Sequence, residues 1–342
     1  MPTEPKILAL QFKYFGDAVL MTPALRALRE KFPNGDLHVL VPEGIEPLLR
    51  HLPWLDRVWA MPRQRGRASI RRTWPVIRQL RRERFDYSVD FAGNDRGAIL
   101  SFLIGAQKRL SWATDGGFVG RRFCYNQFVA PEMTARHESA RLAQLLSGWN
   151  ITSSALVAEI RSDPALVPAA QKLLPAGKIL CHLASSQPKK EWPLIHWAAL
   201  WQLAAAAGME LIFTTGLGAR EESLLTEFKR LAPGTPVLEP LPDLALYLAV
   251  LQRAGLFISG DTGPLHFAAG LGVPTLALFG PSSPAQWAPI GMPHRFLTGN
   301  PCTCGNVSVC ESPNHCLAAI SPQMVFRELK AIRDAAGRIS QA

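Results

Sequence analysis

The sequence predicts an α/β protein built from two successive Rossmann-like halves. Short apolar runs alternate with helical apolar patterns along the chain, which is typical of open parallel sheets with helices on both faces. This alternation weakens over residues 113–130, gives way to a proline-containing connection over residues 148–175, and then begins a second time. With 342 residues, the chain is long enough for two domains that each bury a core.

The first half begins with a buried strand over residues 6–12, followed by a loop over residues 13–17. Thr22 and Pro23 predict a helix start, because a capping residue precedes a proline at the first helical position. Further strands are predicted at residues 37–41, 57–60 and 87–91, and further helices at residues 46–49, 70–80, 99–104 and 137–146.

The second half repeats the pattern with strands at residues 178–183, 210–214, near 237, 256–259 and 275–279. Helices are predicted at residues 194–207, 221–231 and 244–254, and a last helix starts at Ser321-Pro322. We therefore expect a first domain over residues 1–165, a second over residues 176–320 and a terminal helix over residues 321–342.

The stretch from Gly255 to Pro281 predicts the unit around which the second half is organised. Its first strand ends abruptly in Gly260-Asp261-Thr262-Gly263, and a helical pattern follows. Pro264 falls in the first turn of that helix, where its missing N–H costs nothing. A strand that breaks at glycine before a helix N-terminus suits a site that receives phosphate.

Positive charge is concentrated in one segment of the chain. Nine arginines and one glutamate lie between Arg63 and Arg84, so this segment carries +8 of the net charge of +10. Such a local patch implies an anionic partner, which could be a nucleic acid, a phospholipid surface or a phosphorylated glycolipid. The same pattern also fits a solvated helix face.

Two motifs carry a resemblance to a known family. The strings FGDAVLMTPALRAL near the start and GDTGPLHFAAGLGVPTLALFGPSSP in the second half resemble glycosyltransferase family 9, the bacterial heptosyltransferases. The resemblance implies a GT-B fold, with two Rossmann-like domains facing a cleft and the terminal helix returning towards the first domain. It also implies inverting transfer of heptose from an ADP-heptose donor to a lipopolysaccharide core acceptor.

Asp17 is the candidate catalytic base. It follows the first strand, at the sheet edge where ligands of open α/β proteins collect. An inverting transfer needs a base for the proton of the attacking hydroxyl, and a carboxylate can serve. From the residues alone, Asp17 could equally cap the local turn; its GDxVL…P context resembles the base motif of the family.

The second half supplies the candidate donor-binding residues. A strand end followed by hydroxyls and lysines can hold a diphosphate, and the position of Lys190 before Trp-Pro resembles that of the phosphate-contacting lysine of the family. Backbone N–H groups at a helix N-terminus suit the leaving diphosphate, whereas an acidic side chain suits sugar hydroxyls. The predicted donor residues are Ser185, Ser186, Lys190, Glu221, Glu222, Asp261, Thr262, Gly263 and His266.

The first half supplies the candidate acceptor-binding residues. Guanidinium groups pair with phosphates or carboxylates of an anionic glycolipid. The predicted acceptor residues are Arg63, Arg65, Arg67, Arg71, Arg72, Arg121 and Arg122.

We expect no metal in catalysis, because the lysine and the helix terminus take the place of the divalent cation that other glycosyltransferases hold in an Asp-x-Asp motif. A separate cluster, Cys302, Cys304, Cys310 and Cys316, leaves three alternatives open: a structural zinc ion, a disulfide staple or free thiols.

The chain lacks an apolar run long enough to span a membrane, and its N-terminus does not match a signal peptide. We therefore expect a cytoplasmic enzyme, peripheral to the inner membrane, with an ADP-sugar and an anionic glycolipid as partners and no nucleic acid. One alternative keeps the family and changes the nucleotide sugar or the acceptor. Another is a nucleic-acid-binding protein built on the arginine segment, although that segment lacks interleaved aromatic residues.

Overall fold

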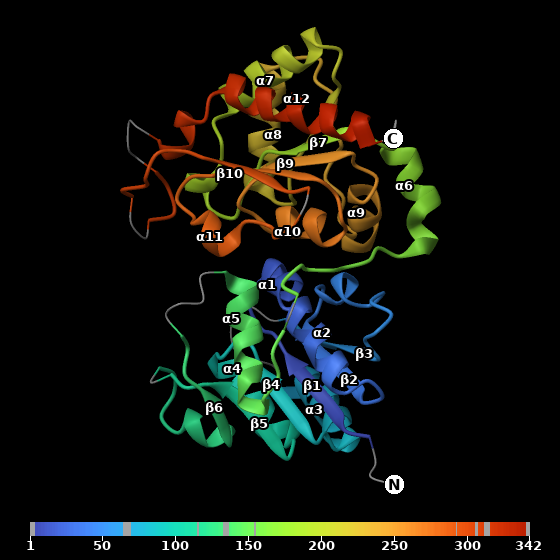
Figure 1. The fold of residues 1–342 in the computed structure, drawn as a ribbon, viewed down its shortest axis with the longest axis vertical. Helices are drawn as coiled ribbons and strands as arrows, with labels where there is room; N and C mark the ends of the chain where they lie inside the picture. The colour runs from blue at the N-terminus through green and yellow to red at the C-terminus, as the bar shows by residue number, and fades with distance from the viewer. Residues whose placement is uncertain are drawn as a thin grey trace. The chain divides into compact units, whose positions relative to one another are not determined.

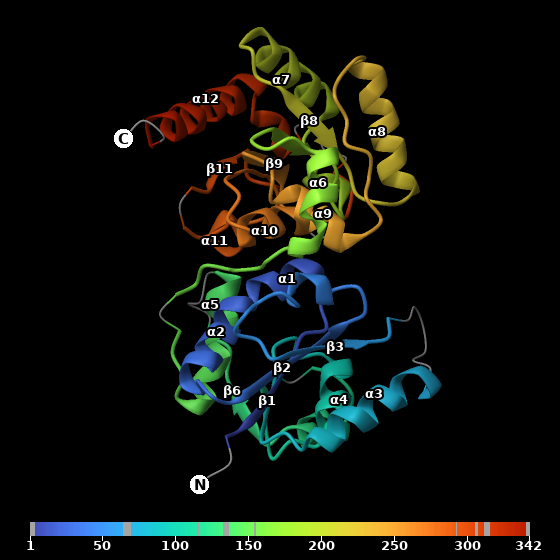
Figure 2. The same ribbon diagram turned by 90° about the vertical axis from the view of Figure 1, so that its right-hand side faces the viewer.

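The structure is a computed structural model, which describes residues 4–63, 70–114, 116–132, 137–153, 155–291, 293–304, 307–310 and 315–339 (Figures 1 and 2). The chain divides into two compact units, Met1–Arg161 and Ser162–Ala342. This division falls close to the end of the predicted first domain at residue 165.

The first unit is built on a six-stranded parallel sheet with the order β3-β2-β1-β4-β5-β6. Its strands are β1 (Lys6–Leu10), β2 (Asp36–Pro42), β3 (Arg57–Met61), β4 (Tyr87–Asp90), β5 (Lys108–Trp112) and β6 (Gln127–Val129). Ala9 of the central strand lies between Val39 and Val89, and all three side chains are completely buried. The strand order reverses between β1 and β4, which makes this the switch point where ligands of such sheets bind.

Helices cover both faces of this sheet (Figure 1). They are α1 (Phe15–Leu20), α2 (Thr22–Lys31), α3 (Ile70–Glu83), α4 (Asp95–Ile104) and α5 (Glu138–Gln144), with 3₁₀ turns η1 (Glu46–Leu48), η2 (Arg121–Cys124) and η3 (Leu145–Trp149). Residues 15–17 are helical, so the loop predicted for residues 13–17 is shorter than expected. Thr22 does not cap α2, since its hydroxyl donates to the Val19 carbonyl, 2.7 Å away, inside the preceding turn.

The second unit contains a five-stranded parallel sheet with the order β11-β10-β9-β7-β8. Its strands are β7 (Ile179–His182), β8 (Leu211–Thr214), β9 (Leu256–Gly260), β10 (Thr275–Phe279) and β11 (Arg295–Thr298). The strand predicted near Val237 is a single bridge to Phe213. The switch point of this sheet lies between β7 and β9.

The helices of the second unit are α6 (Val167–Leu173), α7 (Leu194–Ala206), α8 (Ala219–Leu231), α9 (Leu244–Leu251), α10 (Gly263–Gly270), α11 (Pro284–Trp287) and α12 (Pro322–Ile339), with 3₁₀ turns η4 (Pro164–Leu166), η5 (Pro188–Lys190) and η6 (Cys316–Ala319). Trp197, Phe213 and Phe228 are fully buried and in edge or tilted ring contact between α7, β8 and α8. Such aromatic contacts stabilise a core beyond the area that they bury.

The terminal helix α12 covers most of residues 321–342, for which a return towards the first domain stays a prediction, and residues 340–342 lie outside the described residues. It packs along α7 of the second unit (Figure 2), and its Val325 and Leu329 are completely buried in the core of that unit. The apolar stripe at helical spacing therefore completes the second core, in agreement with the assignment of these residues to the second compact unit.

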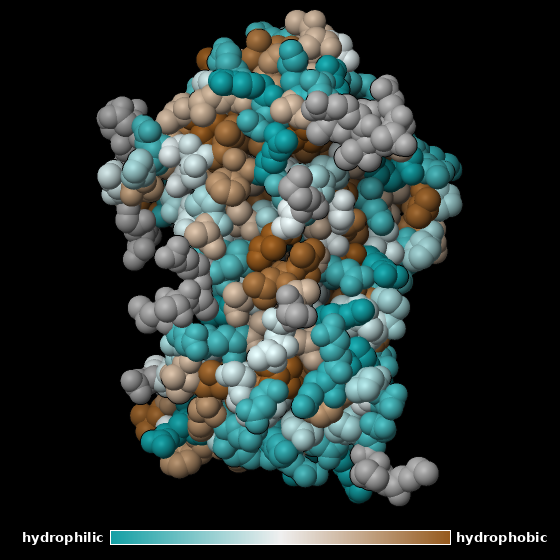
Figure 3. Space-filling view, in the orientation of Figure 1, coloured by the Kyte–Doolittle hydropathy of each residue, from teal (hydrophilic) through white to brown (hydrophobic). Residues whose placement is uncertain are grey.

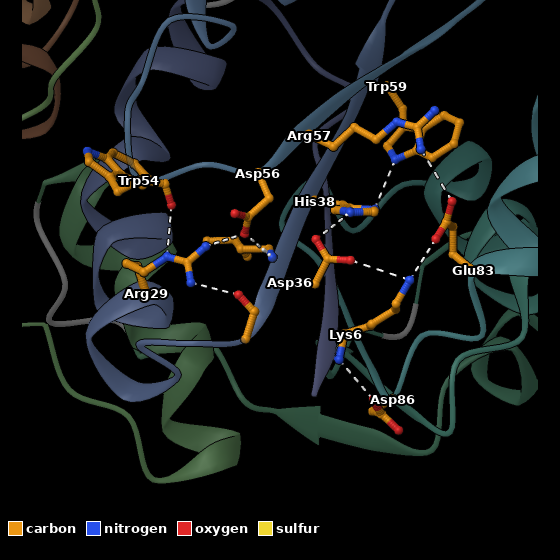
Figure 4. A network of polar contacts seen from close by, with 12 residues as sticks. Lys6, Arg29, Asp36, His38, Trp54, Asp56, Arg57, Trp59, Glu83 and Asp86 are labelled. Atoms are coloured by element: carbon orange, nitrogen blue, oxygen red, sulfur yellow. Dashed lines mark hydrogen bonds and ion pairs between the residues drawn. The ribbon is translucent and has the colours of Figure 1, made fainter. Parts of the chain in front are cut away.

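A polar network holds the edge of the first sheet where its strands begin (Figure 4). Lys6 Nζ lies 2.8 Å from Glu83 Oε2 and 3.4 Å from Asp36 Oδ2. The buried His38 bonds Asp36 through Nε2 at 2.8 Å and accepts the indole N–H of Trp59 at Nδ1, 3.2 Å away. Since ligands collect at the opposite edge of such sheets, we interpret this network as structural.

Candidate active site

The loops after β1 and β4 meet at the switch point of the first sheet. The side-chain amide of Asn94 donates to the Phe12 carbonyl, 3.1 Å away, and so joins the two loops. Asn94 also caps α4, because its Oδ1 accepts the backbone N–H of Gly97. The predicted base Asp17 lies in the first turn of α1, the helix that follows β1.

Asp17 is buried, with 7% of its surface exposed, and its Oδ2 accepts the backbone N–H of Tyr14 at 3.1 Å. Asp17 therefore makes the turn-capping contact, while its role as the base stays a prediction. Burial raises the pKa of Asp17, and the negative charge of Glu138 adds to the increase, whereas Lys13 and the Tyr14 N–H act against it. A carboxylate with a raised pKa is a stronger proton acceptor than an exposed one.

Two charged residues near Asp17 were missed in the sequence. Glu138, the first residue of α5, is 3% exposed, and Arg141 binds both of its carboxylate oxygens, at 2.8 and 2.6 Å. Helix α5 packs against α1. The hydrogen bond to Glu138 raises the pKa of Arg141, and the negative charge of Asp17 adds to the increase. The spacing of an acid and an arginine three residues apart at a helix start was a usable signal, but nothing local indicates that it faces Asp17.

Arg63 contacts the helix that carries the base, since its guanidinium is 5.5 Å from the ring centroid of Phe15 in α1. Arg71 and Arg122 are exposed, and Arg72 is 3.5 Å from Glu43. Arg65 and Arg67 lie outside the described residues.

Arg96 was not predicted from the sequence. Its guanidinium lies 4.9 Å from the ring centroid of Phe12, and it donates to the Pro62 carbonyl at 2.9 Å.

Arg121 has a different environment from the other predicted acceptor residues. Its guanidinium donates to the carbonyl oxygens of Gly93 and Gly116, the latter at 2.6 Å, and its side chain is 11% exposed. In this structure Arg121 therefore ties the loop after β4 to the segment before η2.

Lys190 and Asp261 join the two loops at the switch point of the second sheet. Lys190 Nζ lies 2.6 Å from Asp261 Oδ2, and the carboxylate is 8% exposed. The approach is close because Gly260 has no side chain, since a Cβ there would lie only 2.6 Å from the Lys190 carbonyl oxygen. The first glycine of the GDTG motif is thus required by the contact between the lysine loop and β9.

Ser185 and Ser186 differ in environment. Ser185 is buried; its N–H donates to Glu191 at 2.8 Å and its hydroxyl to the Asp261 carbonyl at 3.4 Å. Arg220 donates to Glu191 at 2.6 Å and to the Ser185 carbonyl, so it holds the loop from α8. Ser186 is exposed, and it is the serine of this pair that a ligand can reach directly.

Helix α10 begins beside the ion pair. Thr262 is its N-cap residue and has extended backbone geometry, while Thr262 and Gly263 are both partly exposed. His266, one turn into the helix, is buried, and its Nε2 lies 4.0 Å from Asp261 Oδ1. The structure thus brings four predicted donor residues together with Lys190, in a place where backbone N–H groups favour an anion.

The two candidate glutamates of α8, Glu221 and Glu222, lie in different environments. The carboxylate of Glu221 is 3.2 Å from Arg220 and turns towards the Gly216–Gly218 loop, where a Cβ at Gly218 would lie 3.0 Å from Glu221 Oε2. Glu222 is exposed. Glu221 is therefore the better placed of the two to reach a ligand at the edge of the sheet.

The four clustered cysteines lie beside the lysine loop. Cys304 Sγ is 3.0 Å from Cys310 Sγ, Cys316 is buried, and the Lys189 N–H donates to the Ser308 carbonyl at 3.2 Å. All six cysteines of the chain are free thiols in this structure. Among the described residues, which leave out 305–306 and 311–314 of this segment, no three cysteine, histidine or acidic side chains are arranged to hold a metal ion. The zinc, disulfide and free-thiol alternatives all stay open.

Comparison with solved structures identifies the fold. The fold matches GT-B glycosyltransferases: it superposes on a glycosyltransferase family 9 structure from Veillonella parvula with a TM-score of 0.81 at 20% identity, covering 96% of this chain and 97% of that one. It superposes on the ADP-heptose lipopolysaccharide heptosyltransferase II of Escherichia coli with a TM-score of 0.77 at 20% identity, covering 96% and 98%.

The family follows from the sequence. Residues 73–315 match the profile described as glycosyltransferase family 9 (heptosyltransferase), and the chain belongs to this family. It is 22% identical to lipooligosaccharide heptosyltransferase 2 of Haemophilus ducreyi, over 96% of this chain and 99% of that protein. It is 25% identical to lipopolysaccharide heptosyltransferase 1 of E. coli K12, over 96% and 100%. The protein is therefore a glycosyltransferase, and the resemblance seen in its two motifs is confirmed.

Proposed function

We propose that this protein transfers heptose from ADP-heptose to a lipopolysaccharide core acceptor with inversion, with Asp17 as the general base and without a metal ion. The proposal is supported by family membership and by the names of relatives, which are lipopolysaccharide and lipooligosaccharide heptosyltransferases. One similar E. coli structure was solved with ADP-2-deoxy-2-fluoro heptose.

The Lys190–Asp261 ion pair beside the N-terminus of α10 carries the proposal. The ammonium group and the first backbone N–H groups of the helix supply positive charge for the diphosphate of the donor. Asp261 holds Lys190 at 2.6 Å, and its second oxygen can accept from sugar hydroxyls. Glu221 would bind the ribose of the nucleotide, since carboxylates accept hydrogen bonds from both ribose hydroxyls.

In the reaction, the acceptor hydroxyl oxygen forms a bond to the anomeric carbon of the heptose while the bond from that carbon to the diphosphate oxygen breaks. The hydroxyl proton passes to Asp17, and ADP leaves with its new charge stabilised by Lys190 and the α10 N-terminus. The raised pKa of Asp17 suits this transfer, because the carboxylate must accept the proton as the bond forms.

The acceptor would be an anionic glycolipid bound by Arg63, which contacts Phe15, and by the newly recognised Arg96, which contacts Phe12 in the loop that precedes Asp17. We propose that the enzyme acts in the cytoplasm at the inner membrane as a peripheral protein. Within the described ranges, no helix has the length and apolar content that crossing a bilayer requires.

A competition assay tests the donor. ADP-heptose, ADP-glucose, UDP-glucose and GDP-mannose are each offered with a heptose-deficient core acceptor, and nucleotide release is measured. We expect ADP release with ADP-heptose to exceed release with each of the others by at least about a hundredfold, as hydrogen-bonding sites discriminate strongly. Preferential turnover of another nucleotide sugar would show that heptose is not the sugar transferred, while the chain would still belong to the same family.

A further inference from the structure

Helices α3 and α4 and the turn η2 form one exposed surface of the first unit that mixes arginines with large apolar side chains. Trp74, Ile99, Phe102 and Phe123 are 50%, 48%, 56% and 75% exposed, respectively. Helix α4 packs against α3 on one side and η2 on the other. Around β6, which follows η2, apolar side chains are visible on the surface at the lower left of Figure 3.

The helical spacing places the two kinds of side chain next to each other. Arg81 donates to the Leu103 carbonyl at 3.0 Å, so its side of α3 borders α4. Trp74 and Arg78 share that side, because residues at intervals of four and three lie along one stripe of a helix. The exposed stripe of α4 carries Ile99 and Phe102.

The charge of this surface is mainly positive, although Arg72 lies 3.5 Å from Glu43 and α4 begins with the exposed Asp95. The described part of α3 exposes Arg71, Arg72, Arg78, Arg81 and Arg82, and η2 adds Arg122. The acidic residue of α3, Glu83, is paired with Lys6 and Arg57 at 2.8 and 3.3 Å. It therefore neutralises positive charge at the start of the strands and not on this surface. Arginines beside exposed tryptophan, phenylalanine and isoleucine are the composition of a surface that lies on an anionic bilayer.

We propose that this α3–α4–η2 surface binds anionic phospholipid. The arginines bind headgroup phosphates, while Trp74, Ile99, Phe102 and Phe123 enter the boundary between headgroups and acyl chains. Both helices start at the sheet edge that carries Asp17, because each follows a parallel strand of that sheet. A bilayer along this surface therefore brings a lipid-anchored acceptor to the loop before Asp17, and in this respect the inference rests on the proposed function.

Flotation of the full chain with vesicles tests the proposal. Vesicles of phosphatidylethanolamine and phosphatidylglycerol in equal parts are compared with vesicles of phosphatidylcholine alone. We expect binding to the anionic vesicles only, weakened by salt, since the attraction is screened. Two double variants, Arg78→Glu with Arg82→Glu and Ile99→Ser with Phe102→Ser, should each bind at least about tenfold more weakly.

Matched controls change the same kinds of residue on the second unit. Arg230→Glu with Arg327→Glu, and Ile195→Ser with Phe296→Ser, alter exposed positions and should bind vesicles like the unchanged protein. Transfer to a soluble, deacylated acceptor should be unchanged in all four variants, which separates lipid binding from catalysis. Equal vesicle binding by all variants would overturn the proposal, and so would binding of the unchanged chain to duplex DNA but not to vesicles.

Discussion

Lys190 and Asp261, 71 residues apart in sequence, form an ion pair 2.6 Å long across the switch point of the second sheet. The pair fixes the lysine ammonium at the start of α10, where a diphosphate has both a cation and helix N–H groups as partners. Because Asp261 is almost fully buried, removing one partner alone leaves an uncompensated charge.

Lys190→Ala should weaken donor binding by about 10- to 100-fold, since a hydrogen bond to a charged group contributes about 1.5–3 kcal/mol. The single variant should also lower the melting temperature, because the Asp261 carboxylate loses its cation. The double variant Lys190→Ala with Asp261→Asn should recover stability but not affinity. Calorimetric titration with ADP measures the affinity, and a thermal melt measures the stability. Unchanged donor affinity in the single variant would show that Lys190 does not bind the donor.

Asp17→Asn should reduce kcat by at least about a hundredfold and leave the Kd for ADP unchanged. Asparagine can still accept the Tyr14 N–H at the start of α1, so the fold of the helix is kept while the base is lost. Thr22→Ser, which keeps the hydroxyl that bonds Val19, serves as the nearby control. Substantial turnover by Asp17→Asn would mean that another group accepts the proton.

The base must be deprotonated to act, so the rate should fall as the pH is lowered through the pKa of Asp17. Burial and the charge of Glu138 raise this pKa, so the fall should occur at a higher pH than for an ordinary aspartate. Glu138→Gln removes a like charge and releases Arg141 from its ion pair, and both changes favour the carboxylate form. The acidic limb of kcat/KM should therefore move to lower pH. Glu30→Gln, at an exposed position of α2, should leave the profile unchanged, and an unmoved limb in Glu138→Gln would contradict the role assigned to that residue.

Turnover should be insensitive to EDTA and to added Mg²⁺, because Lys190 and the α10 N-terminus are proposed to supply the positive charge that a metal would otherwise supply. The test compares initial rates after extensive chelation, with and without added Mg²⁺. Loss of activity on chelation followed by recovery with Mg²⁺ would require a metal in the mechanism.

Gly97→Ala should destabilise the first unit by about 1–3 kcal/mol, the range typical of overpacked cores. A Cβ at this position would lie 2.2 Å from Asp90 Oδ2, and that carboxylate is held by the Tyr125 hydroxyl at 2.6 Å and the Ala92 N–H at 3.0 Å. Gly116→Ala is the matched control, since no neighbour lies within 4 Å of its added Cβ. Equal denaturation midpoints for the two variants would show that the Asp90 loop adapts without cost.

The sequence by itself determined the alternating elements, the family and the motifs that bear Asp17, Lys190 and the GDTG turn. These features depend on residues that are close together in the chain. The signals are the spacing of apolar residues, the positions of glycine and proline, and acidic residues in the first turn of a helix. The apolar spacing after Ser321-Pro322 also predicted the helix at the C-terminus.

Only the tertiary structure decided which distant groups meet. Strand order brings Lys190 to Asp261, packing of α5 against α1 puts Glu138 and Arg141 near the base, and α12 joins the second core. It also showed that Arg121 holds loop carbonyls and that Ser185 is buried. The physical reason is that strand order and the packing of helices are set by burial over the whole unit, which no local pattern records.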